Sequence, residues 1–158
     1  MLRRLYVHKI KEKYMYKALD ISNYIINKCI DDNIPISNMQ LQKILYCIQR
    51  ECLRIYKREM FIDEIEAWPF GPVVPEVYYM YCGFGANPIR IRSTTDCRNN
   101  ISNADLALIN YTVEKIRILK PWDLAEDVHR KDHAYDIIYD NGFGNHRVIP
   151  KDLIKDKG

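Results

Sequence analysis

Glycine and serine are scarce in this 158-residue chain, and long hydrophobic runs are missing. The six glycines never form the G-x-x-x-x-G-K-S/T or G-x-G-x-x-G patterns that surround a phosphate with backbone N–H groups. None of the four serines lies in a G-x-S-x-G nucleophile motif. No apolar stretch approaches the roughly 20 residues that cross a bilayer, and the basic start lacks the apolar region of a secretory signal. These absences argue against a nucleotide-binding loop, a serine hydrolase and a membrane protein.

Cysteine is present in an odd number, without any C-x-x-C pair. The five are Cys29, Cys47, Cys52, Cys82 and Cys97. Complete disulfide pairing and a zinc ribbon are therefore excluded. The first three fall among apolar positions of predicted helices, where a free thiol packs as a small hydrophobe. We expect reduced thiols and a cytoplasmic location. A Cys–His catalytic pair, which meets only in space, stays open as the less favoured alternative.

Candidate metal ligands and acid–base groups are few. His129 and His133 are spaced so that a helix would project both rings from one face, as zinc ligation requires. The residues between them lack the glutamate of a metalloprotease motif, so a hydrogen-bonded structural role is favoured over a metal site. The carboxylates of Asp63, Glu64 and Glu66 are best interpreted as solvated charges, because acid–base catalysis needs a pocket that separates their pKa values. We expect no metal and no cofactor.

Positive charge is concentrated at the N-terminus. Residues 1–17 hold six basic side chains and one acidic side chain, whereas the other 141 residues hold 18 basic and 20 acidic ones. The body of the chain is therefore not a nucleic-acid binder by bulk charge. We treat residues 1–14 as a basic N-terminal extension.

Hydrophobic periodicity predicts a mainly α fold: a single compact domain of four to six helices with one small β-hairpin. Ser37 and Gln40 form a capping-box pattern before the strongest helix, Pro75 can open a helix at its first position, and Ser102 caps another. The predicted helices span 16–32, 38–57, 75–81, 103–119, 122–131 and 149–154. The proline-rich stretch 69–75 is predicted to be a shaped loop without regular structure. Strands 61–67 and 88–92 are predicted to form the hairpin.

Two surfaces of this domain are candidate interaction sites. Lys43, Arg50, Arg54 and Lys57 lie opposite the apolar stripe of the helix 38–57. A plain solvated face is the favoured interpretation of this basic stripe, with an acidic protein partner or nucleic acid as alternatives.

The second surface is rich in rings, because tyrosines follow the proline loop directly and adjacent helical positions cannot all face one core. Ordinary core and boundary packing is the favoured interpretation of these rings, with an interface as the alternative, because tyrosine and tryptophan on rigid segments are frequent interface anchors. The candidate partner-binding residues here are Trp68, Phe70, Pro72, Val74, Tyr78 and Tyr79.

Two sequence blocks resemble a known family. Residues 41–46 read LQKILY, similar to an L-Q-K-L-L-Y helix signature, and residues 66–78 read EAWPFGPVVPEVY, similar to E-A-W-x-x-G-P-V-V-P-x-V-Y. In this order and spacing they resemble the Panacea domain family, also known as SocA-like or GepA-type phage-associated proteins. The resemblance covers roughly residues 15–154, so the domain is expected to span 15–158. The late family segment keeps His129, but Ala134 and Tyr135 replace its usual Pro-Trp pair.

The resemblance implies a non-enzymatic protein. Family members act as antitoxins that neutralise a toxin by direct binding, and one works as an adaptor that delivers its toxin to a protease. We therefore expect a phage- or mobile-element-associated antitoxin whose partner is a cognate toxin or another protein, with a protease if it is an adaptor. The alternative is a phage-associated regulator that binds nucleic acid through its basic N-terminus and the helix stripe. The sequence leaves the oligomeric state open.

Overall fold

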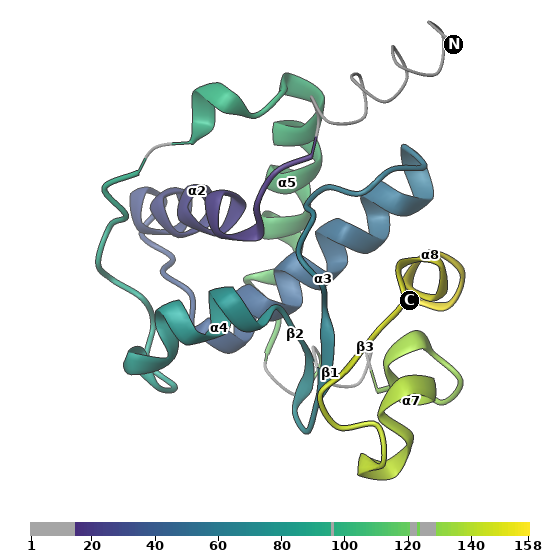
Figure 1. Cartoon of the computed structure of the whole chain (residues 1–158). Helices are drawn as coiled ribbons and strands as arrows, with labels where there is room; N and C mark the ends of the chain where they lie inside the picture. The colour runs from purple at the N-terminus through teal and green to yellow at the C-terminus, as the bar shows by residue number, and fades with distance from the viewer. Residues whose placement is uncertain (1–14, 96, 121–122, 124–128) are drawn as a thin grey trace, which may run out of the picture.

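A computed structural model of the chain describes residues 15–95, 97–120, 123 and 129–158. Within these ranges the fold is mainly α-helical, with a small antiparallel sheet at one end (Figure 1). The helices are α2 (Ala18–Asp31), α3 (Asn38–Ile55), α4 (Pro75–Tyr81), α5 (Asn103–Ile116), α7 (Ala134–Tyr139) and α8 (Lys151–Lys157). The strands are β1 (Glu66–Trp68), β2 (Gly71–Val73) and β3 (Arg147–Val148). The predicted fold class is confirmed.

Helix α3 is the centre of the molecule, and α2, α4, α5 and α8 all pack against it (Figure 1). Its start is the predicted capping box: the Ser37 hydroxyl accepts a hydrogen bond from the Gln40 amide at 3.3 Å, and the Gln40 side chain accepts one from the Ser37 amide at 2.9 Å. Leu41, Ile44 and Ile48 on this helix are fully buried. The core therefore forms around α3.

Strand β1 lies in the middle of the sheet, antiparallel to β2 on one side and to β3 on the other. The prediction that 69–75 has no regular structure is wrong for Gly71–Val73, which pairs with β1. Pro72 fits there because β2 is an edge strand, and an edge tolerates the missing N–H donor. The predicted pairing of 61–67 with 88–92 is also wrong. Instead, the Ile89 amide donates to the Ile36 carbonyl at 2.8 Å, which ties that segment to the connection between α2 and α3.

The sequence prediction located most helices within a few residues. Helix α4 begins at Pro75, and the Ser102 hydroxyl caps α5 by accepting a hydrogen bond from the Asp105 amide. Helix α7 and strand β3 were not predicted. The predicted helix 122–131 and the basic extension 1–14 lie outside the described residues, apart from Asp123 and residues 129–131. No helix in the described ranges combines the length and the apolar composition that a membrane crossing needs.

Candidate functional site

Trp68 occupies the end of β1, where a hairpin of two connecting residues leads into β2. Its indole N–H donates to the Glu66 carboxylate at 2.8 Å, and its backbone carbonyl accepts a hydrogen bond from the Tyr135 hydroxyl at 2.6 Å. The side chain is 5% exposed, so it is largely covered by its neighbours. The indole N–H and the backbone carbonyl of Trp68 are therefore both held by hydrogen bonds, which gives this buried residue a defined orientation.

Four rings surround Trp68 at contact distance. The ring centroids of Tyr78, Phe70 and Tyr79 lie 5.0, 5.9 and 5.9 Å from its own. The His146 imidazole stacks on the indole at 4.4 Å with an interplanar angle of 2°. We call Trp68, Phe70, Tyr78, Tyr79 and His146 the aromatic platform. Its outer members are open to solvent, because Phe70 is 41% and Tyr79 is 62% exposed.

The start of α3 holds the platform from behind. The Gln42 side-chain oxygen accepts a hydrogen bond from the Val74 amide at 2.9 Å, just before α4. The Gln42 amide nitrogen donates to Asn38 at 3.0 Å, and Asn38 in turn donates to the Tyr78 carbonyl at 3.0 Å. Gln42 and Asn38 are both buried. These side chains hold the backbone at Val74 and at Tyr78, next to Tyr79, so the rings sit on a stiff frame.

The turn of the hairpin rests on the segment before α7. Gly71 has φ +130°, a conformation that side-chain-bearing residues rarely adopt, and an added Cβ would lie 4.0 Å from His129 Nε2. The His129 ring packs edge-on against Tyr135 with centroids 4.6 Å apart. Partial burial lowers the pKa of His129, while a hydrogen bond with the Phe70 backbone opposes this shift. Burial also raises the pKa of Tyr135 to about 12. We therefore assign buried Tyr135 a supporting role under the platform, and exposed His129 a position beside the hairpin turn.

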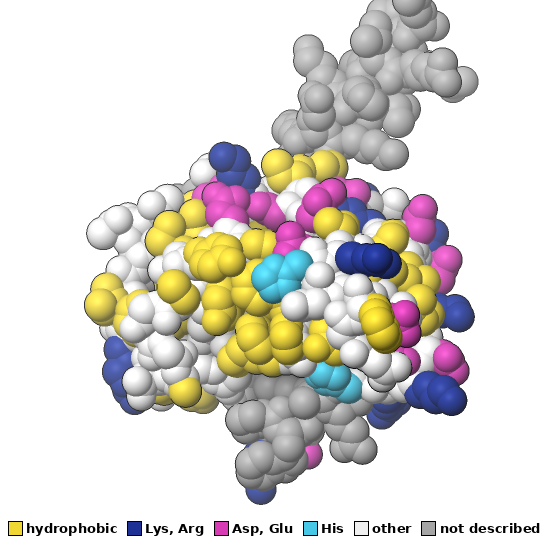
Figure 2. Space-filling view, turned by 60° about the horizontal axis from the view of Figure 1, so that its bottom comes forward, with side chains coloured by type: hydrophobic (Ala, Val, Ile, Leu, Met, Phe, Trp, Pro, Cys, Tyr) yellow, Lys and Arg dark blue, Asp and Glu magenta, His cyan; other side chains and the backbone are white. Residues whose placement is uncertain are grey.

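Figure 2 shows hydrophobic side chains gathered into one continuous area around a histidine, with acidic side chains along one edge. Glu66, which holds the Trp68 indole, is half-buried. Glu76 is exposed three and four residues before Tyr79 and Met80, so it shares their face of α4. Met80 is 57% exposed. The platform is thus an exposed apolar surface with carboxylates at its border.

The ring-bearing residues singled out from the sequence come together, whereas the others do not join the surface. Trp68, Phe70, Tyr78 and Tyr79 meet in the platform. Pro72 and Val74 are buried beneath it. His146 was considered only as a possible metal ligand and not as part of this surface, because it reaches Trp68 through the pairing of β3 with β1, which the sequence did not reveal.

The basic stripe of α3 is not the solvated face that was predicted, because α8 packs beside it. Lys43 is 8% exposed. Arg54 donates to the carbonyls of Lys155 at 3.1 Å and Gly158 at 2.5 Å. Arg50 forms an ion pair with Glu51 at 3.0 Å, and only Lys57 extends the stripe as a fully exposed residue. Lys43, Arg50 and Arg54 therefore stand apart from the rings of the platform.

His129 and His133 do not share a helical face. Between them, Asp132 has φ +65°, and His133 precedes α7 in an extended conformation. Their rings consequently serve different places: His129 contacts Tyr135, and His133 lines a pocket beside α8. Across the described ranges, no three side chains of His, Cys, Asp or Glu converge in a way that could hold a metal ion.

Comparison with known proteins gives a consistent result. The family model described as "Antitoxin SocA-like, Panacea domain" matches residues 41–135, which include all of the platform except His146. A similar protein is the Antitoxin SocA of Caulobacter vibrioides (strain NA1000 / CB15N), which is 38% identical over 68 residues. That alignment covers 43% of this chain and 36% of the relative, so it spans about a third of the relative's length. No solved structure matches the chain.

Proposed function

The chain belongs to the family of SocA-like antitoxins with a Panacea domain, and on this premise we propose that it is an antitoxin that binds a protein toxin directly. In this proposal the antitoxin neutralises its toxin by occupying the toxin's surface, without catalysing a reaction. The aromatic platform is the docking surface. The observation that carries the proposal is the exposure of Phe70 and Tyr79 on a frame that is held by buried hydrogen bonds.

Rigid rings are well suited to such docking. Aromatic side chains are enriched at interface hot spots, where they bury a large area. Immobilising flexible side chains opposes association, and here Tyr78 and Tyr79 already contact Trp68 at ring distances of 5.0 and 5.9 Å. Little further ordering is needed when the partner arrives. The platform therefore supports direct binding better than a surface of long, mobile side chains would.

The border of the platform indicates the chemistry of the partner. Glu66 and Glu76 place carboxylates next to the exposed rings. A toxin surface with an apolar centre and flanking Lys or Arg residues would complement both features. We propose this kind of surface as the occupant of the platform.

A regulator that binds nucleic acid is a weaker candidate. That alternative relied on the basic stripe, but Lys43 is buried and Arg54 is bonded to carbonyls of α8. The described residues therefore offer no row of solvated cations on this face of α3 for a phosphate backbone.

Co-expression with the product of the adjacent reading frame tests the proposal. We expect the chain to rescue cells from that product, and the two proteins to purify together. Tyr79→Ala and Phe70→Ala should weaken rescue and co-purification while the melting temperature falls only slightly, because Tyr79 is 62% and Phe70 41% exposed. Tyr111→Ala is the matched control: Tyr111 is 65% exposed on α5, outside the platform, and its loss should leave rescue intact.

Two results would count against the proposal in different ways. If the adjacent product is harmless, or if it stays toxic and unbound in the presence of the wild-type chain, the antitoxin function fails for this pair. If rescue is normal in the Tyr79 and Phe70 variants but lost in the Tyr111 variant, the chain is an antitoxin that uses another surface.

A further inference from the structure

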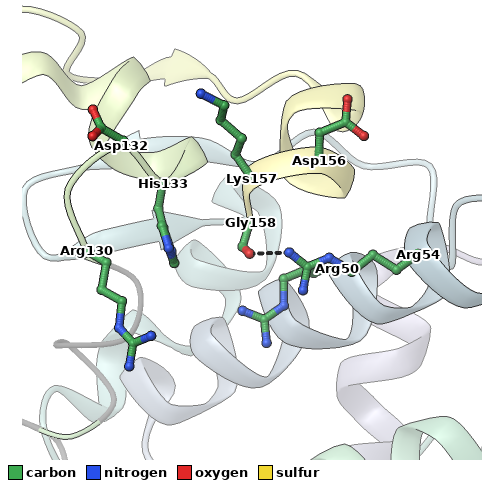
Figure 3. A pocket seen from close by; sticks show the side chains of 8 residues that line it. All are labelled: Arg50, Arg54, Arg130, Asp132, His133, Asp156, Lys157 and Gly158. Carbon is green, nitrogen blue, oxygen red and sulfur yellow. Dashed lines mark hydrogen bonds between the residues drawn. The ribbon is translucent and has the colours of Figure 1, made fainter.

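A hollow that is separate from the aromatic platform lies between α3, α8 and the segment that leads into α7 (Figure 3). Its volume is about 500 Å³. Four formally cationic side chains line it: Arg50, Arg54, Arg130 and Lys157. The imidazole of His133 lies among them. We call this hollow the basic pocket.

The side chains around the basic pocket are oriented by charge. In Figure 3 the guanidinium groups of Arg50 and Arg130 and the ring of His133 reach toward a common space. The side chains of Asp132, Asp156 and Lys157 also line the pocket, but they turn away from that space. Two guanidinium groups and one imidazole therefore face the interior, where the Gly158 backbone oxygen is already bonded to Arg54. The Asp132 and Asp156 carboxylates lie at the border, which favours an anion between Arg50, Arg130 and His133.

Two of the arginines are held in place by other contacts. Arg54 donates to the Lys155 carbonyl at 3.1 Å and to the Gly158 carbonyl at 2.5 Å, so it caps the end of α8. Arg50 Nε lies 3.0 Å from the Glu51 carboxylate. These contacts fix the positions of the two charges before an anion arrives.

We propose that the basic pocket binds a phosphate group, either as inorganic phosphate or as the monoester of a small molecule. Planar guanidinium groups match the oxygens of a phosphate and can each donate two hydrogen bonds. Several inward N–H donors from Arg50, Arg130 and His133 suit the multiple acceptor oxygens of a phosphate better than chloride. The proposal concerns a different site from the platform and does not depend on the antitoxin function.

A binding titration tests this proposal on the full chain, with any affinity tag placed at the N-terminus because Gly158 lines the pocket. Inorganic phosphate, titrated at constant ionic strength, should bind measurably and raise the melting temperature relative to chloride. Arg130→Gln should weaken phosphate binding by about tenfold or more, the effect of losing a charged hydrogen bond. Arg130 is exposed, so this variant should fold normally.

The control variants distinguish phosphate binding in the basic pocket from a general effect of surface charge. Lys131→Gln removes one exposed positive charge beside Arg130, outside the pocket lining, and should leave phosphate binding unchanged. His133→Gln is a second test, because His133 forms no side-chain cap to α7, and it should weaken binding without unfolding the protein. Equal phosphate responses in the wild type and all three variants would overturn the proposal, as would no binding at millimolar phosphate.

A second ligand distinguishes the two sources of the phosphate group. A nucleoside monophosphate is titrated alongside inorganic phosphate, again with the Arg130 and Lys131 variants. Tighter binding of the monoester would assign the pocket to a small phosphorylated molecule, and equal or weaker binding would assign it to inorganic phosphate. Either result requires the loss of binding in Arg130→Gln. Monoester binding that this variant retains would overturn the assignment to the pocket.

Discussion

Two glutamines on α3 accept hydrogen bonds from segments far along the chain. Gln42 accepts the Val74 amide at 2.9 Å. Gln49 accepts the Met60 amide at 2.8 Å and the Phe61 amide at 3.3 Å, and it donates to the Phe61 carbonyl at 2.9 Å. Both side chains are at most 2% exposed. Since a buried backbone N–H without an acceptor is costly, the glutamine of the LQKILY block has a structural reason to be there.

Replacing these glutamines by leucine should therefore destabilise the fold unequally. Gln42→Leu leaves the Val74 N–H without its acceptor and the Asn38 side-chain oxygen without its donor, at a cost of about 1–3 kcal/mol for each group. Gln49→Leu orphans two N–H groups and one carbonyl, and it should lower the free energy of unfolding by more. Urea unfolding of both variants checks the order. Equal losses, or a larger loss for Gln42→Leu, would contradict this account.

Tyr135 predicts a pH dependence at the alkaline end. Burial raises the pKa of Tyr135 to about 12. In the unfolded chain the hydroxyl of this tyrosine ionises near pH 10, so the native state holds the hydroxyl proton more tightly. The contribution of the protonated Tyr135 hydroxyl to the free energy of unfolding is therefore complete below pH 10 and is lost as the pH rises toward 12. Its loss amounts to about 2 kcal/mol over this range.

Tyr135→Phe removes this titration and should flatten the fall in unfolding free energy between pH 10 and 12. The variant should also be somewhat less stable at pH 7, because the Trp68 carbonyl loses its hydroxyl donor. Urea midpoints at several alkaline pH values provide the measurement. Tyr111→Phe is the control, since Tyr111 is 65% exposed and should leave the profile as it is in the wild type. Identical profiles for Tyr135→Phe and the wild type would refute the prediction.

At the scale of elements, helix starts were predictable because their signals are local. Ser37 with Gln40, Pro75 and Ser102 each mark a helix within a few residues of its first turn. Strand β3 has only two residues, too few for an alternating pattern. Helix α7 has six residues, which is under two turns. Such short elements are stabilised by their packing and pairing, so their sequences alone did not reveal them.

The basic stripe shows a related limit. A helical projection places Lys43 and Arg54 opposite the apolar side of α3, but it cannot say which element packs there. In the structure α8 lies against α3, and Arg54 caps its end. The long apolar stem of a lysine or arginine allows such a residue to line a helix contact. The side of α3 on which Lys43 and Arg54 lie was predictable from the sequence, whereas the element that packs against this side depends on the tertiary structure.

The two serine caps allow a prediction for single helices. Ser37→Ala removes the acceptor of the Gln40 amide and disrupts the capping box of α3, so it should cost about 1 kcal/mol. Ser102→Ala should cost a similar amount through α5. Ser93→Ala is a control in an exposed loop, where the hydroxyl accepts only the Thr95 amide at 3.3 Å. Urea unfolding measures all three, and a loss in Ser93→Ala as large as in Ser37→Ala would contradict the capping argument.

At the scale of the whole molecule, most of the platform was predictable because it is local in the sequence. Trp68, Phe70, Tyr78 and Tyr79 lie within twelve residues of one another. The fifth ring was not predictable, because His146 lies just before β3, along the edge of β1 opposite β2, where its amide donates a hydrogen bond to the Ala67 carbonyl. The basic pocket was also beyond reach, since its lining comes from α3, α8 and the segment before α7.

The chemistry of the platform predicts how toxin binding should respond to temperature and salt. Burial of the exposed rings of Phe70 and Tyr79 should give the complex a negative heat-capacity change, the mark of apolar burial. Salt should weaken binding only slightly, because few charges border the rings and solvated pairs at a rim contribute little. Calorimetric titration of the wild-type chain with the toxin, at several temperatures and two salt concentrations, measures both quantities.

Variants and partner classes then give distinct outcomes in the same experiment. Phe70→Ala should reduce the size of the heat-capacity change, whereas Tyr111→Ala should leave it unchanged because Tyr111 lies outside the platform. A steep fall of affinity with salt would instead indicate binding through many charge contacts, as in the release of counterions from a nucleic acid. Such a slope, with no effect of Phe70→Ala, would move the binding surface away from the platform toward the basic side chains.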